Sequence, residues 1–440
     1  MIKRFIRRVL GLPSDAMLRV PREKHGLSRE AISPAAAKVC TALREAGFSG
    51  YVVGGAVRDL LLGIAPKDFD VATDARPEQV KPLFRRAIVI GRRFRLVHVM
   101  LGPETVEVST FRAADPETAE KDEHGRVLRD NVFGTQAEDA RRRDFTVNAL
   151  YFDPVTQEVI DFHGGLADLK KRVLRVIGDP ETRYREDPVR MLRAVRLGAK
   201  LGLTLDAATR EPIRSMAPLM ERVPPARLFD EMLKLLLSGH ASACLRQLRD
   251  VGLQQGLLPL LDVILEQPLG ERFVTLALAQ TDERVRAERP VSPAFLFAAL
   301  LWHEVLAAWK LRQGRGERST PALENAMDEV LETQCAKLAI TRKLTATMRE
   351  VWAMQPRFEQ RSGSRAYRLL EAARFRMAYD FLALRAASGE VPAELEAWWR
   401  TFQSADAETR KAMLLPDTGP RKRRRRRRKK GPAAPAPEPA

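Results

Sequence analysis

Two glycines and two aspartates at a fixed spacing constrain the fold of this chain more than any other feature. Residues 51–53 predict a strand that runs directly into Gly54 and Gly55, and Asp68 lies 13 residues after Gly55, followed by Asp70. Paired glycines between a strand and a helix let backbone amides approach an anion closely, and the helix start adds partial positive charge. A glycine pair alone is equally typical of an ordinary tight turn, so the interpretation depends on the aspartates.

Asp68 and Asp70 predict a site for a divalent cation. Residues i and i+2 of a strand share a face, so the two carboxylates are expected to project together and to repel each other unless a cation lies between them. Mg²⁺, or Mn²⁺ as the alternative, takes few ligands from protein and the rest from phosphate and water. Such a pair suits two-metal phosphoryl transfer. Glu107, on a neighbouring predicted strand, is a candidate third metal ligand, with an outward-facing charge as the equal alternative.

Arginine-rich sequence supplies candidate contacts to a triphosphate and a ribose. Arg58 follows the glycine pair and has a guanidinium fork suited to phosphate. Residues 141–148 are RRRDFTVN, in which Arg143 and its neighbours suit a triphosphate and Asp144 can accept a hydrogen bond from a ribose hydroxyl. The role of Asn148, four residues after Asp144, stays open. By itself the segment is also compatible with a surface cluster of ion pairs.

Residues 185–190, REDPVR, predict a helix start that can read a nucleobase. Pro188 suits the first helical position, which makes Asp187 the N-cap and gives a purely structural explanation of the motif. Asp187 and Arg190 are three residues apart and face the same side of the helix. An accepting carboxylate beside a donating guanidinium matches the pairing edges of adenine and cytosine, and not those of guanine and uracil. The pair therefore selects A and C but does not separate them.

The order of strand and helix patterns predicts an α+β chain. Residues from about 35 to 165 mix the two signals, and helical spacing dominates beyond about 165. The apolar runs are too short for a membrane span, so no transmembrane helix is expected. We predict strands at 51–53, 69–72, 87–90, 95–101, 105–111, 147–152 and 158–161. We predict helices at 35–46, 57–62, 190–201, 226–237, 241–251, 293–310, 323–338, 343–354 and 364–385.

The charge balance points to a polyanionic partner. The 440 residues have a formal net charge of +18, and the run at 421–430 supplies ten positive charges, yet the chain is basic even without that run. A basic body with a basic tail favours nucleic acid or a membrane surface. Cys40, Cys244 and Cys335 are far apart and odd in number, which predicts no disulfide framework or zinc site and favours a reducing compartment. Residues 1–12 fit a solvated leader or a short amphipathic helix on RNA or a membrane.

Together the four motifs resemble those of the class II nucleotidyltransferases, which include CCA-adding enzymes and bacterial poly(A) polymerases. The resemblance runs motif by motif from residue 51 to about 202 and continues more loosely through 223–230, VPPARLFD. Three segments resemble the poly(A) polymerase branch: the run IVIGRRFRLVHV at 88–99, the run RYREDPVRMLR at 183–193, and residues 365–385. The basic tail is similar in kind. The resemblance implies a polynucleotide adenylyltransferase of the poly(A) polymerase branch.

The known activity of this family implies a role for each motif. The reaction is template-independent addition of AMP from ATP to RNA 3′ ends, with release of pyrophosphate, and it promotes RNA turnover. The metal ligands implied are Asp68 and Asp70, with Asp144 as a further catalytic carboxylate. The nucleotide-binding residues are Gly54, Gly55, Arg58 and Arg143 toward the phosphates, with Glu186, Asp187, Arg190 and Arg193 on the nucleotide-reading helix. The alternatives are a CCA-adding tRNA nucleotidyltransferase and, from another class, a non-catalytic RNA-binding protein.

The resemblance and the composition also predict the domain plan and the partners. We expect a basic leader (1–30), a nucleotidyltransferase catalytic head (31–165), a helical neck (166–255), a helical body (256–415) and a disordered Arg/Lys-rich tail (416–440). The expected partners are ATP, RNA 3′ ends and the RNA-degradation machinery. A cytoplasmic monomer without a stable membrane span is expected, with peripheral membrane association through the leader as the alternative.

Overall fold

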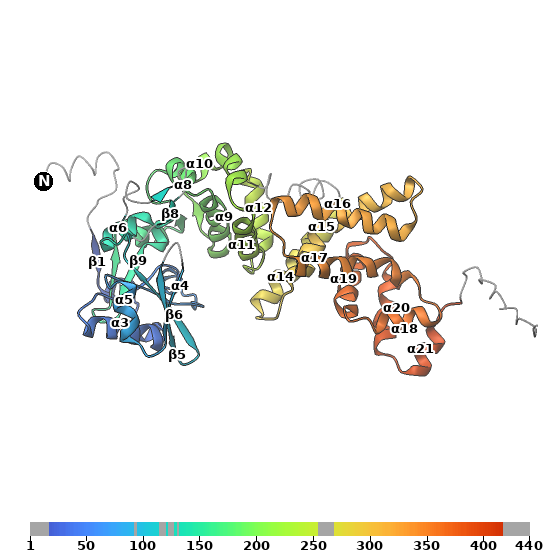
Figure 1. The fold of residues 1–440 in the computed structure, drawn as a ribbon, viewed down its shortest axis with the longest axis horizontal. Coiled ribbons are helices and arrows are strands. Elements are labelled where there is room, and N and C mark those ends of the chain that lie inside the picture. Colours follow the sequence, from blue (N-terminus) through green and yellow to red (C-terminus); the bar gives the residue numbers. More distant parts are fainter. Residues whose placement is uncertain are drawn as a thin grey trace, which may run out of the picture. The chain divides into compact units, whose positions relative to one another are not determined.

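The computed structural model describes residues 17–91, 95–113, 120–121, 127–129, 132–253 and 268–416. The chain divides into two compact units, Met1–Met348 and Arg349–Ala440. The first contains a sheet-based head followed by helices, and the second is helical (Figure 1). An α+β fold is therefore confirmed. Most of the predicted leader and nearly all of the predicted tail lie outside the described residues.

The head is built on a mixed sheet whose described strands lie in the order β1-β10-β9-β2-β3-β6-β5-β4. Neighbouring strands are antiparallel except β3 and β6, which are parallel. The strands of this sheet are β1 (Leu18–Val20), β2 (Tyr51–Val53), β3 (Asp70–Thr73), β4 (Ala87–Ile90), β5 (Leu96–Leu101), β6 (Glu104–Thr110), β9 (Leu150–Asp153) and β10 (Glu158–Asp161). Two short pairs lie apart from it: β7 (Glu120–Lys121) with β8 (Val127–Arg129), and β11 (Val173–Leu174) with β12 (Thr204–Leu205).

Short helices surround the sheet, and α3 (Pro34–Glu45) shows why they form where they do. The Ser33 side chain accepts the Ala36 N–H at 3.1 Å, Pro34 occupies the first turn, and the apolar face buries Val39 and Leu43. This helix contacts β3 and β6 and so supports the strands that carry the acidic residues. The other helical elements of the head are α2 (Arg22–His25), η1 (Arg29–Ala31), α4 (Gly55–Leu61), α5 (Pro77–Val80), η2 (Lys81–Leu83), α6 (Gln136–Arg142), η3 (Thr146–Asn148) and α7 (Gly165–Lys170).

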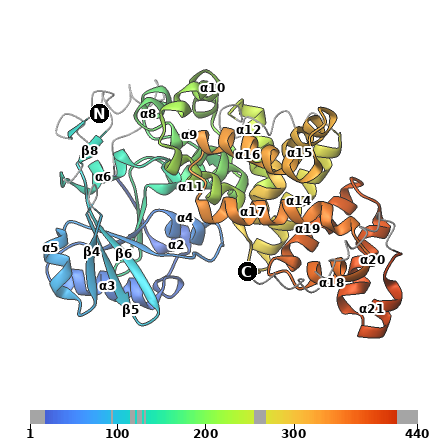
Figure 2. The same ribbon diagram turned by 45° about the vertical axis from the view of Figure 1, so that its right-hand side comes forward.

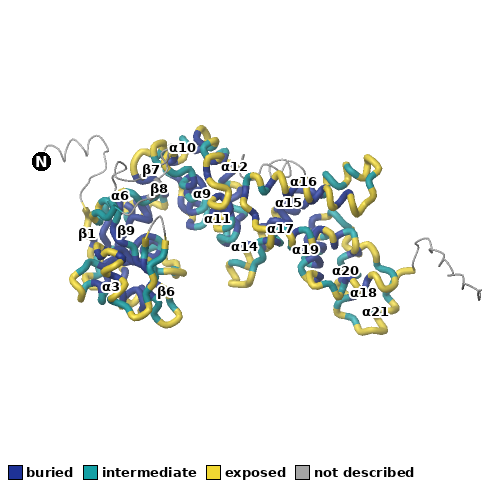
Figure 3. Tube along the Cα trace, in the orientation of Figure 1, coloured by how far each residue is buried: buried dark blue, intermediate teal, exposed yellow. Residues whose placement is uncertain are grey.

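Helices make up the rest of the first unit. In sequence order they are α8 (Pro180–Glu186), α9 (Val189–Leu201), α10 (Ala207–Met216), η4 (Ala217–Arg222), α11 (Pro225–Leu236), α12 (Ala241–Val251), α14 (Pro268–Arg286), α15 (Pro293–Gly314), α16 (Ser319–Lys337) and α17 (Arg342–Met354), which ends in the second unit. Helix α9 packs against α11 and α12, and these three lie together in both views (Figures 1 and 2). All three helices contain several buried residues, drawn dark blue in Figure 3.

Helix α15 is the one described helix long and apolar enough, by length and composition, to cross a membrane. Half of its apolar window is buried inside the protein, and it packs between α14 and α16. Phe297, Leu301 and Trp302 are at most 1% exposed. These contacts are those of a core helix, which passes the same compositional test as a membrane span.

In the second unit, the structure differs from the helix predicted at 364–385. A single helix was expected at 364–385, but two helices form, α18 (Gly363–Leu370) and α19 (Phe375–Ser388), so the prediction of one helix is wrong. Both helices bury apolar residues in one aromatic core that includes Phe358 and Trp399, and a continuous helix could not turn both faces inward. The unit also contains η5 (Gln355–Glu359), α20 (Ala393–Ser404) and α21 (Ala407–Met413).

Several other boundaries differ from the sequence prediction. The strand expected at 147–152 begins at Leu150, because Thr146–Asn148 form a 3-10 turn (η3). Strand β1 lies within the segment predicted as a leader, where its pairing with β10 extends the sheet to residues before 31. Helices α14 and α20 were not predicted from the sequence.

Candidate active site

Strand register places the glycine turn beside the acidic residues. Val53, the last residue of β2, lies opposite Asp70, the first residue of β3. Gly54 follows at once with φ +74° and ψ −124°, a conformation that favours glycine, and its N–H donates to the Leu150 carbonyl at 3.1 Å. Asp68 lies in the loop before β3, so strand alternation does not set its direction as the sequence argument assumed.

Asp70 is close to two other carboxylates, those of Glu107 and Asp68. Across the parallel β3–β6 pair, Asp70 stands opposite Glu107. Partial withdrawal from water, repulsion from Glu107 and a smaller repulsion from Asp68 raise the pKa of Asp70 to about 6, although Arg143 acts in the opposite direction. His98 Nε2 lies 3.6 Å from Glu107 Oε2. A cation would relieve this repulsion, so the site has the electrostatic character of a cation site.

The residues present fit Mg²⁺ better than a metal that needs a full protein cage. Among the described residues, no group of three or more His, Cys, Asp or Glu side chains is arranged to hold a metal by itself. Mg²⁺ is commonly bound through one or two carboxylates together with phosphates and water. Asp68 and Asp70 supply such a pair, and Glu107 stays a candidate rather than part of a preformed triad.

All three nitrogens of the Arg58 guanidinium hydrogen-bond to protein side chains. Arg58 is 6% exposed, its Nε donates to Asp59 Oδ1 at 2.8 Å, and its Nη1 donates to Asn148 Oδ1 at 2.6 Å. Nη2 makes a second bond to Asp59. The side chain therefore holds Asn148 in place beneath the glycine turn, which gives Asn148 the role that the sequence left open.

Arg143 is fixed directly beside Gly54. Its Nη2 donates to Asp139 at 3.0 Å, its Nε lies 3.2 Å from the Tyr151 hydroxyl, and its guanidinium covers the Tyr151 ring at 5.2 Å. Burial alone would lower the pKa of Arg143, but Tyr151 and Asp139 raise it, so the group stays positive. A Cβ added at Gly54 would lie 3.3 Å from Arg143 Nη1. The close packing leaves a positive group against the glycine backbone.

Gly54→Ala is expected to destabilise the head by about 2 kcal/mol, since a Cβ is strained at this backbone conformation, and to weaken ATP binding by displacing Arg143. Thermal unfolding and ATP titration measure the two effects. Gly63→Ala is the matched control, because Gly63 has φ +73° but an added Cβ meets nothing within 4 Å. Equal ATP affinity in the two variants would contradict the proposed contact between Gly54 and Arg143.

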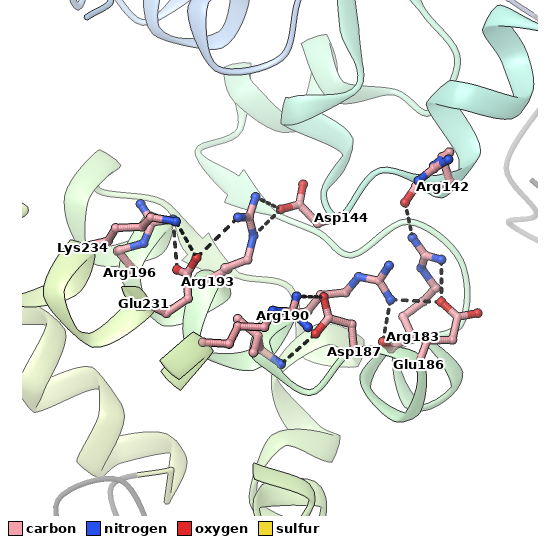
Figure 4. A network of polar contacts seen from close by, with 12 residues as sticks. Arg142, Asp144, Arg183, Glu186, Asp187, Arg190, Arg193, Arg196, Glu231 and Lys234 are labelled. Atoms are coloured by element: carbon pink, nitrogen blue, oxygen red, sulfur yellow. Dashed lines mark hydrogen bonds and ion pairs between the residues drawn. The ribbon is translucent and has the colours of Figure 1, made fainter. Parts of the chain in front are cut away.

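Asp144 is buried and both of its oxygens are used. Arg193 donates to Oδ2 through Nε at 2.8 Å and Nη2 at 2.6 Å, and the Phe145 N–H and Asn148 Nδ2 donate to Oδ1 at 2.8 and 3.0 Å. Burial would raise its pKa, but Arg193 and the other donors lower the pKa of Asp144 to about 2. Through Arg193, Asp144 links the head to α9 (Figure 4). A ribose contact would have to share an oxygen that already has partners.

The residues predicted to read the base cluster at the start of α9. Helix α9 begins at Val189, so Pro188 and not Asp187 directly precedes it, one residue later than predicted; Asp187 Oδ1 still accepts the Val189 N–H at 3.3 Å. The other oxygen of Asp187 accepts from Arg227 at 2.7 Å. Arg190 Nη1 donates to Glu186 at 3.0 Å and to the Arg183 carbonyl at 2.7 Å. Asp187 and Arg190 are thus brought together, each with its own protein partner.

Sequence reasoning missed the residues that hold this cluster. Glu231 on α11 is 6% exposed and lies 3.8 Å from Arg193, 3.5 Å from Arg196 and 3.0 Å from Lys234 (Figure 4). It directly follows the run at 223–230 that resembles the family, so extending that run by one residue would have found it. Asp139, Tyr151, Arg183 and Arg227 were also missed.

Three family models match consecutive segments of the chain, in the order of its head and helical parts. The poly A polymerase head domain matches residues 50–175, the probable RNA and SrmB-binding site of polymerase A matches 202–265, and the polymerase A arginine-rich C-terminus matches 315–431. Poly(A) polymerase I of Salmonella typhi is 47% identical over 420 residues, which cover 92% of this chain and 90% of the relative. The chain belongs to the bacterial poly(A) polymerase family. It is therefore an enzyme, a polynucleotide adenylyltransferase, as the motifs predicted.

The CCA-adding branch shares the fold but matches less of the sequence. A CCA-adding enzyme of Streptococcus pyogenes is 40% identical over 202 residues, which cover 46% of this chain and 49% of the relative. The crystal structure of the Bacillus stearothermophilus CCA-adding enzyme in complex with CTP has a TM-score of 0.57 and 27% identity, and the match covers 84% of this chain and 82% of that one. The extended sequence match thus favours membership of the poly(A) polymerase branch.

Proposed function

We propose that this poly(A) polymerase extends RNA 3′ ends with AMP by two-metal phosphoryl transfer at Asp68 and Asp70. The observation that carries the proposal is the position of Asp70, which lies opposite Glu107 across β3 and β6 and opposite Val53, the residue directly before the Gly54 turn. Mg²⁺ bound there would neutralise the triphosphate and activate the RNA 3′-hydroxyl. The protein's own contribution is positioning and charge complementarity, with no covalent enzyme intermediate.

The triphosphate would lie along the glycine turn. The positive φ of Gly54 exposes backbone that a side chain would otherwise cover, and Arg143 supplies a fixed positive charge beside it. Gly55 begins α4, whose first N–H groups add partial positive charge. Because Arg58 is buried against Asp59 and Asn148, we assign it mainly to holding this turn, with phosphate contact limited to its remaining N–H groups.

Base selection would fall to Asp187 and Arg190 at the start of α9. The carboxylate accepts from the adenine amino group and the guanidinium donates to the ring nitrogen. In the structure Asp187 is bonded to Arg227 and Arg190 to Glu186, so the base would contact the atoms of the pair that these bonds leave available. Arg193 would hold Asp144 and so fix the head next to this helix. These contacts exclude guanine and uracil, and cytosine must be rejected by the space around the pair.

The test of this function is an extension assay. Given ATP, Mg²⁺ and an unstructured RNA, the purified protein is expected to produce a ladder of growing products, and chelation of the metal is expected to stop it. The same protein given a tRNA without its CCA end, with CTP and ATP, separates the alternatives: addition of two C and one A followed by arrest would identify a CCA-adding enzyme. No extension of either RNA would contradict the proposed reaction.

Other parts of the proposal depend on composition and family resemblance. We propose that the helical neck and body hold RNA, and that the basic run at 421–430, outside the described residues, adds affinity that falls as salt rises. Promotion of RNA turnover with degradation partners, a monomeric state, a cytoplasmic location and the domain boundaries given above belong to the same proposal. The described residues give no support to attachment at a membrane surface.

A further inference from the structure

Arg183 on α8 makes contacts that the assigned motifs do not explain. Its Nη2 donates to two backbone carbonyls of the head, those of Arg142 at 2.8 Å and Arg143 at 2.7 Å. Its Nη1 donates to Glu186 Oε2 at 2.7 Å. The Arg183 side chain is 13% exposed and its two bonds to the carbonyls are partly buried, whereas Glu186 is 41% exposed; all three bonds are charge-assisted (Figure 4). One guanidinium therefore fastens α8 to the head.

The side chain and the backbone carbonyl of Arg183 both contact residues of the proposed nucleotide site. The two carbonyls come immediately before Asp144, the carboxylate that binds Arg193. On the other side, the backbone carbonyl of Arg183 accepts from Arg190 Nη1 at 2.7 Å, and Glu186 contacts both arginines. Arg183 is thus bonded to the segment that carries the phosphate-side groups and to the residue that reads the base.

We propose that Arg183 is a positioning residue that sets the distance between the base-reading helix start and the catalytic head, and so contributes to the preference for ATP over CTP. Adenine is larger than cytosine, so the two bases place the α-phosphorus differently when they are held by the same Asp187–Arg190 pair. A fixed separation between that pair and Asp70 aligns one of the two nucleotides for attack. The inference rests on the proposed function, since it assumes that both sets of residues contact one nucleotide.

The chemistry of the contact requires arginine. Two carbonyls and a carboxylate are bound at once by a planar fork, and a lysine ammonium is a point charge on a flexible stem that cannot hold all three in one geometry. Arg183→Lys therefore keeps the positive charge but loosens the separation. A misplacement of about 1 Å can cost about 100-fold in rate.

The experiment compares wild type, Arg183→Lys, Arg183→Ala and Arg185→Ala. Arg185 is the matched control: it lies on the same helix and pairs with Glu181 at 3.0 Å, but it is 65% exposed and contacts no site residue among the described contacts. For each protein, kcat and KM are measured with ATP and with CTP on one RNA, together with RNA affinity and thermal unfolding.

We expect Arg183→Lys to lower kcat/KM for ATP by about 10- to 100-fold, mainly through kcat, and to lower the ATP-to-CTP ratio. Its RNA affinity is expected to change less than about twofold, and Arg185→Ala is expected to match wild type. Arg183→Ala is expected to lose at least as much ATP-over-CTP selectivity as Arg183→Lys. If Arg183→Ala does not fold, the result for Arg183→Lys alone tests the inference.

Two results would overturn the inference. One is an unchanged ATP-to-CTP ratio in Arg183→Lys, measured well below its melting temperature, whatever its total activity. The other is a loss of selectivity of the same size in Arg185→Ala. Failure of the wild type to extend RNA with ATP would instead count against the proposed function, and the two failures are therefore distinguishable.

Discussion

Asp70→Asn is expected to lower AMP addition by about 10³-fold and yet to leave the metal-free head as stable as wild type, or more so. The loss of activity follows because the proposed metal ligand is replaced by a neutral amide, and charge stabilisation by a metal contributes several kcal/mol to the transition state. The stability follows because Asp70 is a carboxylate under repulsion from Glu107 and Asp68. Removing its charge removes that repulsion.

The pH dependence of stability gives this prediction a second readout. The pKa of Asp70 in the folded protein is about 6, above its ordinary value of 3.8, so the folded state binds the proton more tightly than the unfolded chain. Its contribution therefore favours folding at low pH and declines as pH rises from about 4 through about 6. Wild type is expected to lose this contribution across that window without metal, whereas Asp70→Asn is not. Calorimetry of both proteins in chelator across the window measures the difference.

Mg²⁺ is expected to reverse the order of stability. A ligand that binds only the folded state stabilises it, so Mg²⁺ should raise the melting temperature of wild type and have little effect on Asp70→Asn. Glu104→Gln is the control, since Glu104 begins the strand that carries Glu107 but pairs with the distant end of β5, at Leu101. Equal Mg²⁺ stabilisation of wild type and Asp70→Asn, with equal activity, would show that the metal site is misassigned.

Local sequence patterns predicted the parts of the fold that depend on local chemistry. The strands at 51–53, 87–90 and 158–161 and the helix at 241–251 have the predicted bounds. Glycines lie at both ends of 51–53 and 241–251 and directly after 87–90. The same patterns placed the glycine turn next to the aspartates, and the register of β2 and β3 agrees. In these cases residues that are close in sequence are also close in the fold, so local sequence patterns were sufficient to predict their arrangement.

The parts that sequence could not predict depend on contacts between distant segments. Nothing local to Arg183 indicates that its guanidinium binds backbone carbonyls 40 and 41 residues away. Asp68 was placed on the strand by alternation, yet β3 begins only at Asp70, where pairing with Val53 becomes available. The break at 371–374 has no glycine or proline to mark it and follows from packing on a shared aromatic core.

The second large effect is expected at the Asp144–Arg193 pair. Asp144→Asn is expected to cost about 2 kcal/mol of unfolding free energy, since Arg193, whose side chain is 33% exposed, loses its doubly bonded carboxylate and keeps only the more distant Glu231 at 3.8 Å. Arg193→Gln is expected to cost less, because Asp144 keeps the Phe145 N–H and the Asn148 amide as donors. The double variant is expected to cost less than the two single variants added together, with a coupling of about 1–3 kcal/mol. Urea unfolding of the four proteins measures it.

The same pair predicts the pH behaviour and tests the role of Asp144. Its pKa in the folded protein, about 2, is below the ordinary 3.8, so its stabilisation is present above about pH 4 and is lost as pH falls toward 2. The stability gap between wild type and Asp144→Asn should therefore narrow as pH falls from about 4 to about 2. Because Arg193 already occupies one oxygen of Asp144, we expect both single variants to lose activity together. Additive stabilities, or full activity in Arg193→Gln alone, would mean that Asp144 serves the nucleotide directly rather than through α9.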